Sequence, residues 1–301
     1  MGAAKFLRGL ALAAGQERLD IVVNTGDDET FYGLHVSPDL DTVVYTLAGV
    51  VNRKQGWGLA ADKFTVLAAL EPFYGKAWFR LGDRDLATHI FRTERMRAGV
   101  RLAAVTAEIA RRLGVRARVM PMSNDPVRTF VKLRGRAPIP FQEYFVRRRF
   151  RGVVERIELR GSRRARPLGA ALEAVRRAEA VIVAPSNPFV SIGPILAVPG
   201  IAAAIRQVRA RVAAISPIVA GRAVKGPAGR MLRALGHEPS ALGVARLYRD
   251  MVGTFVLDNL DRGHAPAVEA LGMRAIVTNT IMATPRRAAQ LADVVMNALA
   301  V

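Results

Sequence analysis

The sequence predicts an α/β protein with a doubly wound, mostly parallel sheet and a small inserted helical subdomain. Short apolar runs typical of buried strands alternate with stretches of helical spacing, and one long stretch has helical spacing only. Hydrophobic residues make up 51% of the 301 residues, enough to bury a core, which excludes a disordered chain. We expect the α/β domain at residues 1–55 and 116–301, and the helical subdomain at 56–115.

The expected strands are short and apolar. The first, Leu19–Asn24, is largely β-branched and ends in a turn, as a buried parallel strand does. The others are expected at Ala117–Met120, Arg128–Leu133, Glu143–Val146, Val153–Leu159, Ala180–Ala184, Val212–Ser216, Thr254–Leu257 and Ala275–Thr278. Of these, Arg128–Leu133 and Glu143–Val146 are expected to form an antiparallel excursion.

The first expected helix begins at Ser37-Pro38-Asp39, which combines a cap, a proline suited to the first turn and an acid at the positive helix end. It runs on through Val43–Val51. Apolar spacing of three and four predicts further helices at Thr65–Leu70, Leu86–Thr93, Leu102–Leu113, Ala171–Ala178, Ala228–Leu235, Ala241–Asp250 and Pro285–Leu299, and one within Ile195–Ala210.

The composition excludes several kinds of site. No cysteine is present, so disulfides, thiolate metal sites and cysteine nucleophiles are ruled out. No run approaches the roughly 18–20 apolar residues of a membrane helix, and the N-terminus lacks a signal-peptide pattern. We therefore expect a soluble, cytoplasmic protein without a membrane partner.

The net charge of +20 favours a phosphorylated partner. The arginines are spread along the chain, and only 6% of residues are aromatic, so stacking platforms for nucleic-acid strands are scarce. A small phosphorylated anion is the expected partner, and nucleic-acid binding is the lesser alternative.

Polar residues gather where predicted strands end or helices begin, the edge at which open α/β sheets bind ligands. Asp39 and Asp41 lie in the first turn of a helix, where carboxylates can hold magnesium or orient a hydroxyl, or merely cap the helix. Arg80 begins a cluster with Asp83 and Asp85 that suits phosphate recognition, or is a solvated ion-pair cluster.

Two turns after predicted strands complete the candidate site. Ser186 and Asn187 lie between prolines and offer a hydroxyl and an amide that can cradle a phosphate or a base edge, or form an ordinary turn. Ser216 precedes a loop with Lys225 and Gly226 that resembles a phosphate-binding loop in composition, without the spacing of a nucleotide-triphosphatase loop.

The histidines and tryptophans carry less weight. The four histidines lack the spacing of a zinc site. Trp57 and Trp78 are expected in the core, and Pro121–Asp125 is either a turn or a further contributor to the cleft.

Nine short stretches of sequence occur in an order that points to one family. They are NTGDD, GLHVSPDLDT, GWG, LGDRDLATHI, PMSNDPVRT, FQEYFV, APSNPFVSIGPIL, SPIVAG and KGPAG. Together they resemble the 2-phospho-L-lactate transferase (CofD) family of coenzyme F-420 biosynthesis, from Lys5 to Ala292. The resemblance implies a Rossmann-like fold with a small helical subdomain, in agreement with the element order.

The resemblance also implies a reaction. The terminal ribityl hydroxyl of deazaflavin FO attacks the lactyl-bearing phosphorus of lactyl-2-diphospho-5'-guanosine, GMP leaves, and magnesium (Mg2+) is required. In some bacterial members the activated acid is the enolpyruvyl analogue. Since phosphoryl transfer depends mostly on positioning and charge stabilisation, a cleft of aspartates, an arginine and backbone donors suits it.

The resemblance implies roles for individual residues. Asp41 and Arg80 match positions that contact FO, and Asp39 and Asp41 are both expected as catalytic residues and metal ligands. The guanosine diphosphate portion is expected on Gly2, Lys5, Ser186, Asn187 and Ser216.

The sequence departs from the family's pattern in two places. Family members open with a strand and a glycine loop of the type GGVGGAKFLRGL, whereas this chain begins MGAAKFLRGL, which puts Met1 opposite a valine. Because GTG is both a valine codon and an alternative bacterial start codon, we expect the natural protein to begin upstream. The missing strand would pair with a neighbour, and the missing glycines would supply phosphate-binding N–H groups. Asn124 stands where the family has a second aspartate, PMSDD.

Three alternative functions remain open at the level of sequence. The first is a weakened or non-catalytic protein that binds nucleotide or deazaflavin, because part of the phosphate loop is absent. The second is a related sugar-nucleotide or dinucleotide enzyme, and the third a nucleic-acid binder. A homodimer is a possible assembly.

Overall fold

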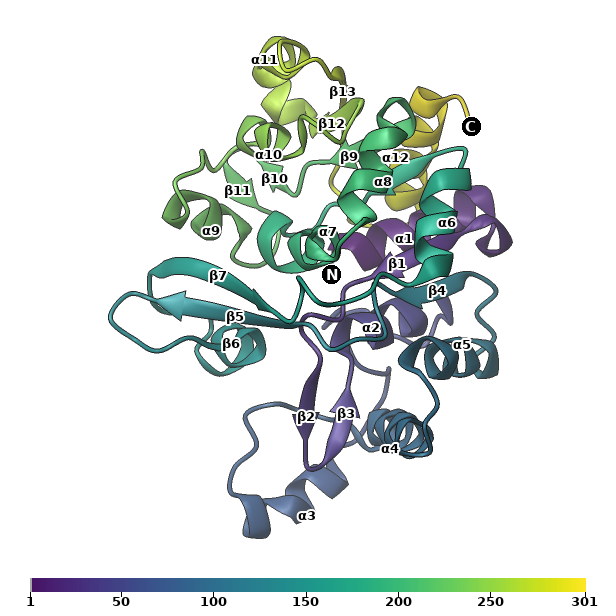
Figure 1. Ribbon diagram of the computed structural model, residues 1–301, viewed down its shortest axis with the longest axis vertical. Helices are drawn as coiled ribbons and strands as arrows, with labels where there is room; N and C mark the ends of the chain where they lie inside the picture. Colours follow the sequence, from purple (N-terminus) through teal and green to yellow (C-terminus); the bar gives the residue numbers. More distant parts are fainter. Residues whose placement is uncertain (1) are drawn as a thin grey trace.

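The computed structural model describes residues 2–301, so Met1 and the expectation of an upstream start lie outside the described residues. Its main sheet has the strand order β13-β12-β9-β8, and every pair in it is parallel (Figure 1). The strands span Arg274–Thr278, Thr254–Asp258, Val212–Ile215 and Val181–Val183, respectively. The predicted parallel sheet is confirmed.

Alternate residues of β9 face two different helical layers, as the pleat of a strand requires. Val212 and Ala214 pack in a core cluster with α6, α8 and α10, which span Gly169–Arg177, Ile201–Gln207 and Ala241–Tyr248. Ala213 and Ile215 pack instead with α1 and α12, which span Gly2–Ala14 and Pro285–Leu299. The sheet is therefore covered on both faces, which makes it doubly wound.

The first and last helices, α1 and α12, lie side by side, purple beside yellow in Figure 1. Gly9 makes this approach possible, because a Cβ atom there would lie 2.2 Å from the backbone carbon of Ala288. The same helix α1 turns Phe6 and Leu10 toward the sheet. The N-terminal helix is thus fixed between the sheet and the C-terminal helix.

A second parallel pair joins β1, Asp20–Val23, to β4, Arg118–Pro121. Helices α2, Pro38–Leu47, and α5, Leu102–Arg112, share one hydrophobic cluster with these two strands. The strand predicted at Leu19–Asn24 is therefore confirmed. The helix predicted from Ser37-Pro38-Asp39 is confirmed at its start, but it ends at Leu47 and does not continue to Val51.

The segment from Gly56 to Gly114 contains helices and no named strand, as its spacing predicts. Helix α3 spans Thr65–Tyr74 and α4 spans Asp83–Arg97, ahead of α5. Figure 1 shows α3 projecting at the bottom of the molecule.

The antiparallel excursion differs from the expected one. Strand β5, Arg128–Leu133, pairs antiparallel with β6, Ile139–Pro140, and β7, Val154–Arg160. The strand predicted at Glu143–Val146 is wrong, because Glu143–Arg147 forms a helical turn, η2, with π-type hydrogen bonding.

Aromatic packing explains this correction. The rings of Phe141 and Phe145 have centroids 5.4 Å apart, and Tyr144 is buried in the same cluster beside Met231. Residues spaced three and four apart share one face of a helix, whereas a strand would turn Tyr144 and Phe145 to opposite sides. Packing all three rings into one cluster therefore requires the turn.

Two short hairpins and several short helices complete the fold. The hairpins went unpredicted because their strands have only two or three residues: β2, Glu29–Phe31, with β3, Leu34–Val36, and β10, Ile218–Val219, with β11, Arg222–Ala223. The remaining helical elements are η1, Gln16–Arg18; η3, Pro188–Ile192; α7, Gly193–Ala197; η4, Arg209–Arg211; α9, Ala228–Ala234; η5, Asn259–His264; and α11, Ala265–Glu269.

Within residues 2–301, no single helix has the length and apolar character needed to cross a membrane. Pro188–Ala197 and Ile201–Gln207 reach that length and composition only together, across a 91° bend.

Candidate active site

A cleft of about 420 Å³ lies along the carboxyl ends of β1, β8, β9 and β13. Parallel sheets bind ligands at this edge. The residues that line the cleft include all eight predicted from the sequence, namely Gly2, Lys5, Asp39, Asp41, Arg80, Ser186, Asn187 and Ser216. The structure thus brings together residues that are up to 214 positions apart in the chain.

One corner of the cleft is acidic. Asn24, at the end of β1, donates from Nδ2 to Asp39 Oδ2 at 2.9 Å and accepts the Gly26 N–H at Oδ1. Burial, followed by the charges of Asp39 and Asp28, raises the pKa of Asp27 well above its ordinary value. Burial also raises the pKa of Asp39. We call Asp27 and Asp39, which both line the cleft, the acidic corner.

Several buried oxygens around the acidic corner lack a hydrogen-bond partner within residues 2–301. They are Thr25 Oγ1, Asp27 Oδ1, Asp28 Oδ1 and Thr129 Oγ1. Unpaired buried oxygens are costly, and hard cations such as Mg2+ take oxygen ligands. The donor set therefore fits a magnesium ion.

Asp41 is held at the floor of the cleft by a buried ion pair. Arg92, in α4, donates from Nη1 to Asp41 Oδ2 at 3.1 Å and from Nη2 to Asp41 Oδ1. Burial alone would lower the pKa of Arg92, but the Asp41 carboxylate outweighs it and raises that pKa. His89 Nδ1 lies 3.7 Å from Asp41 Oδ2.

The network continues from His89 to Asp85 and Tyr45. His89 Nε2 lies 3.4 Å from Asp85 Oδ1, which also accepts the Tyr45 hydroxyl at 2.8 Å. Burial alone would raise the pKa of Asp85, but its contacts with His89 and Tyr45 lower it. Burial, with the charges of Asp41 and Asp85, raises the pKa of Tyr45.

Potential ligand atoms of Asp41, Asp85 and His89 lie within 4.8 Å of one another, closer than their sequence spacing suggests. The guanidinium of Arg92 already lies on both oxygens of Asp41. A divalent cation there would face the charge of Arg92 at short range. The acidic corner is therefore the better cation site.

Sequence analysis missed Arg92 and Tyr45. A signal was present, since Tyr45 follows Asp41 by four residues and Arg92 follows His89 by three, so each shares a helix face with another residue of the network. The spacing alone does not show that these two helix faces meet.

Arg80 lies on an aromatic wall of the cleft. Its guanidinium carbon is 3.9 Å from the ring centroid of Phe64, and its side chain is exposed. Trp57 and Trp78 also line the cleft, and Trp57 is 38% exposed, so the expectation of core tryptophans is wrong. The aromatic residues form a wall instead, because α3 and its flanking loops project away from the main core (Figure 1).

Ser186, Asn187 and Ser216 line the cleft, but the side chains of Asn187 and Ser216 already form hydrogen bonds within their own loops. Asn187 Oδ1 accepts the Phe189 N–H at 2.9 Å and caps η3. Ser216 Oγ donates to the Ile218 carbonyl at 2.8 Å and accepts the N–H of the same residue. These side chains shape the loops, whereas the exposed Lys5 lies in the first turn of α1.

Another wall of the cleft comes from the antiparallel excursion and the loop between β11 and α9. Phe141, Gln142, Phe145 and Val146 line it. Lys225 Nζ donates to the Gln55 carbonyl at 3.2 Å.

The turn after β4 has a structural role. Asn124 Oδ1 accepts the Ala103 N–H in the first turn of α5. None of residues 121–125 is among the described residues that line the cleft.

A family model described as "2-phospho-L-lactate transferase CofD" matches residues 1–277. This chain belongs to the CofD family. The resemblance proposed from nine sequence stretches is confirmed.

Curated relatives of this CofD-family chain carry two names. A "Phosphoenolpyruvate transferase" from Kitasatospora aureofaciens is 41% identical over 97% of this chain and 93% of its own length. One of the same name from Streptomyces griseus is 42% identical over 97% and 96%. A "2-phospho-L-lactate transferase" from Methanosarcina mazei is 36% identical over 99% and 97%.

The fold also matches a solved structure of a UPF0052-family protein from Bacillus halodurans. The TM-score is 0.64 at 18% identity, over 98% of this chain and 96% of that one. At this identity the similarity concerns the fold, and it agrees with the α/β architecture described above.

Proposed function

We propose that this chain transfers a phosphoacid group from a guanosine diphosphate-activated donor to the terminal ribityl hydroxyl of deazaflavin FO, with release of GMP, in coenzyme F-420 biosynthesis. The observation that carries the proposal is the single cleft in which buried carboxylates, Arg80 and the turns after β8 and β9 meet. Membership of the CofD family supports a phosphotransferase rather than a protein that only binds these ligands.

Of the two donors implied by the family, the phosphoenolpyruvyl donor is the one we propose. The relatives named phosphoenolpyruvate transferase are 41% and 42% identical to this chain, against 36% for the Methanosarcina mazei 2-phospho-L-lactate transferase. The lactyl and enolpyruvyl groups differ by two hydrogens, so both donors belong in the test.

The cleft offers complementary surfaces to the two substrates. The first turn of α1, with Gly2 and Lys5, offers the backbone N–H groups that a helix start leaves without an intrahelical partner, and a cation, near the turn of Ser186 and Asn187, which suits a diphosphate. The aromatic wall beside Arg80 suits the flat deazaflavin ring.

The chemistry requires one bond to form and one to break. The FO hydroxyl oxygen bonds to the phosphorus that bears the acid, and the bond from that phosphorus to the GMP oxygen breaks. Asp41, whose oxygens keep lone pairs beyond those bound by Arg92, accepts the hydroxyl proton. GMP leaves as a phosphate and needs no strong acid.

Magnesium is proposed at the acidic corner. Asp39, with Asp27 beside it, would hold the ion, so of the two predicted ligands Asp39 keeps that role and Asp41 acts on the hydroxyl. When bound, the ion supplies positive charge against the phosphoryl oxygens of the donor.

A mass-spectrometric assay tests the proposal. Purified protein is incubated with FO, Mg2+ and either guanosine diphosphate donor, and a parallel reaction contains a chelator in place of Mg2+. We expect the phosphoacid–FO product and GMP in equal amounts, faster with the enolpyruvyl donor and only with Mg2+. A folded protein that binds FO but forms product with neither donor would be the binding protein of the alternative hypothesis.

The cytoplasmic location and the homodimer expected from the sequence stay predictions. Fractionation of cells and the mass of the purified protein in solution would test them.

A further inference from the structure

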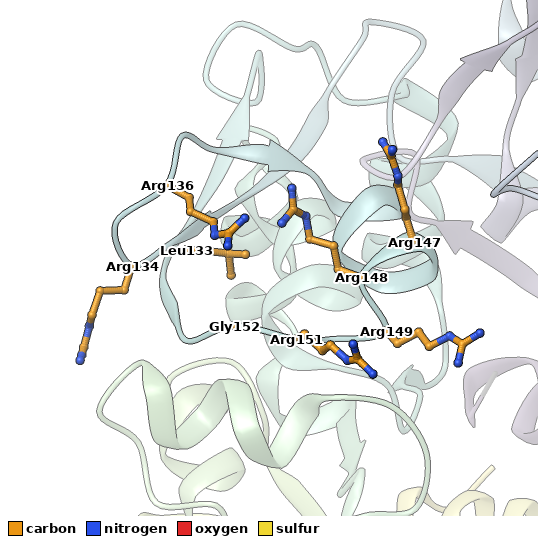
Figure 2. A pocket seen from close by; sticks show the side chains of 8 residues that line it. All are labelled: Leu133, Arg134, Arg136, Arg147, Arg148, Arg149, Arg151 and Gly152. Atoms are coloured by element: carbon orange, nitrogen blue, oxygen red, sulfur yellow. The ribbon is translucent and has the colours of Figure 1, made fainter. Parts of the chain in front are cut away.

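A second hollow, of about 530 Å³, lies on the antiparallel excursion, outside the cleft. Leu133 and Gly152 line it together with six arginines, Arg134, Arg136, Arg147, Arg148, Arg149 and Arg151 (Figure 2). We call it the arginine hollow. Between residues 134 and 152 the sequence contains a single acid, Glu143.

Most of these guanidinium groups have no carboxylate partner. Arg148 donates from Nε and Nη2 to Glu143 Oε1 at 3.1 and 3.0 Å. Within residues 2–301, no carboxylate lies within 4.0 Å of the other five arginines of the hollow. Like charges held together repel one another, and a bound anion would remove that repulsion.

The arginines come from two segments of the chain, and two of them face each other. Figure 2 shows Arg136, after β5, and Arg148, after η2, with their guanidinium groups turned toward each other above Leu133. Arg149 and Arg151 lie below Arg148 in the same view. Two planar guanidinium groups facing one space can each bind a phosphate oxygen pair.

The turn that carries these arginines has an unusual backbone. Arg149 and Phe150 have φ values of 48° and 59°, in the left-handed region that costs free energy for residues other than glycine. Gly152 has φ 102°, and a Cβ atom there would lie 3.1 Å from Leu133 Cδ1. The turn is thus packed against the floor of the hollow in a conformation that is maintained at a cost, as binding sites often are.

We propose that the arginine hollow binds a small anion with two or more phosphate groups, at a site separate from the cleft. Its volume lies within the roughly 300–1,000 Å³ of small-molecule sites. Its lining contains no aromatic side chain, so it offers nothing for bases to stack on, which disfavours a nucleic-acid strand.

The site is connected to the cleft through η2. Phe141, Gln142, Phe145 and Val146 line the cleft, and the arginines at 147–149, which follow at once, line the hollow. An anion that fixes these arginines therefore also fixes one wall of the cleft.

Calorimetric titration with inorganic diphosphate tests the proposal on the full chain. Two double variants remove charge from the hollow, Arg136→Gln/Arg148→Gln and Arg149→Gln/Arg151→Gln. The control, Arg163→Gln/Arg164→Gln, removes the same charge from exposed arginines outside both the hollow and the cleft. Melting curves check that every variant is folded, and the second hollow variant spares the Arg148–Glu143 contact.

We expect diphosphate to bind the hollow variants about 100-fold more weakly at one class of site, since each lost charged contact is worth about tenfold. The control should match the unaltered protein. Equal binding by the hollow variants and the control would overturn the proposal. So would single-stranded DNA that binds through these arginines when diphosphate does not.

A cleft variant separates this proposal from the proposed function. Lys5→Gln should slow transfer to FO and leave the hollow-dependent diphosphate binding unchanged. Loss of that binding in Lys5→Gln would place the diphosphate in the cleft and overturn the separate site.

Discussion

Arg92, only 1% exposed, donates both of its terminal nitrogens to the carboxylate of Asp41 at the floor of the cleft. Arg92 is not among the described residues that line the cleft. The orientation of Asp41 therefore depends on a side chain that lies behind it, on a different helix.

Breaking this pair should destabilise the protein strongly. Arg92→Met leaves the Asp41 carboxylate buried without its partner, which should lower the free energy of unfolding by about 3–5 kcal/mol. Urea denaturation measures it. Arg95→Met is the control, because Arg95 is 42% exposed and pairs with Glu108, so its loss should cost about 1 kcal/mol or less. Equal losses in the two variants would contradict the role of the pair.

Asp41→Asn should transfer slowly even in its folded state, and it should also lose stability, because it leaves the buried Arg92 guanidinium without its carboxylate. Replacing the carboxylate that accepts the hydroxyl proton should raise the barrier by roughly 2–4 kcal/mol, or about 30- to 1,000-fold in rate. Steady-state kinetics and circular dichroism measure rate and fold. The exposed Asp293→Asn is the control for loss of a negative charge. A correctly folded Asp41→Asn with normal turnover would remove Asp41 from the mechanism.

Arg80→Lys should not behave as a conservative change. Lysine keeps the charge but loses the planar group that lies over Phe64. We expect the KM for FO to rise about tenfold, by analogy with a lost contact of about 1.4 kcal/mol. Arg112→Lys is the control, because Arg112 lies over Phe91, away from the cleft. Unchanged FO kinetics in Arg80→Lys would show that Arg80 is a surface residue with no part in binding FO.

Asp27 should make stability depend on pH. Its folded-state pKa lies well above the ordinary 3.8. The carboxyl group therefore costs no stability at a pH below the ordinary pKa, and the free energy of unfolding falls as the pH rises from there through the raised pKa. Asp27→Asn should therefore melt at a higher temperature than the unaltered protein at neutral pH, and the gain should vanish near pH ~4.

The effect of magnesium on the melting temperature gives a second test with the same variant. The ion should raise the melting temperature of the unaltered protein at neutral pH, because it binds the folded state, and should do so much less in Asp27→Asn. Equal shifts in both proteins would place the ion away from the acidic corner.

The strands and helices of the main sheet were predictable because each has a strong local pattern. Pro285–Leu299 was predicted with the observed bounds, since its cap, its proline and its amphipathic spacing agree. Glu143–Val146 has β-forming residues in sequence, yet three aromatic rings could reach one core only through a helical turn. Tertiary packing overrode local preference there.

The candidate site was predictable in its residues more than in its contacts. Asp39 and Asp41 differ by two positions, yet Asp39 lies in the acidic corner beside Asn24 while Asp41 pairs with Arg92. Helix periodicity points residues two apart in different directions, but only the packing of α2 against α4 shows what each one meets.

The central claim is that this cleft transfers a phosphoacid to FO by attack at the phosphorus that bears the acid. A single-turnover reaction with enzyme in excess over the enolpyruvyl donor, quenched and analysed by mass spectrometry, tests it directly. The account predicts FO that carries the phosphoacid, with one GMP released for each molecule of product. Guanylated FO with release of the phosphoacid, or a folded enzyme that leaves donor and FO unchanged in the presence of Mg2+, would contradict it.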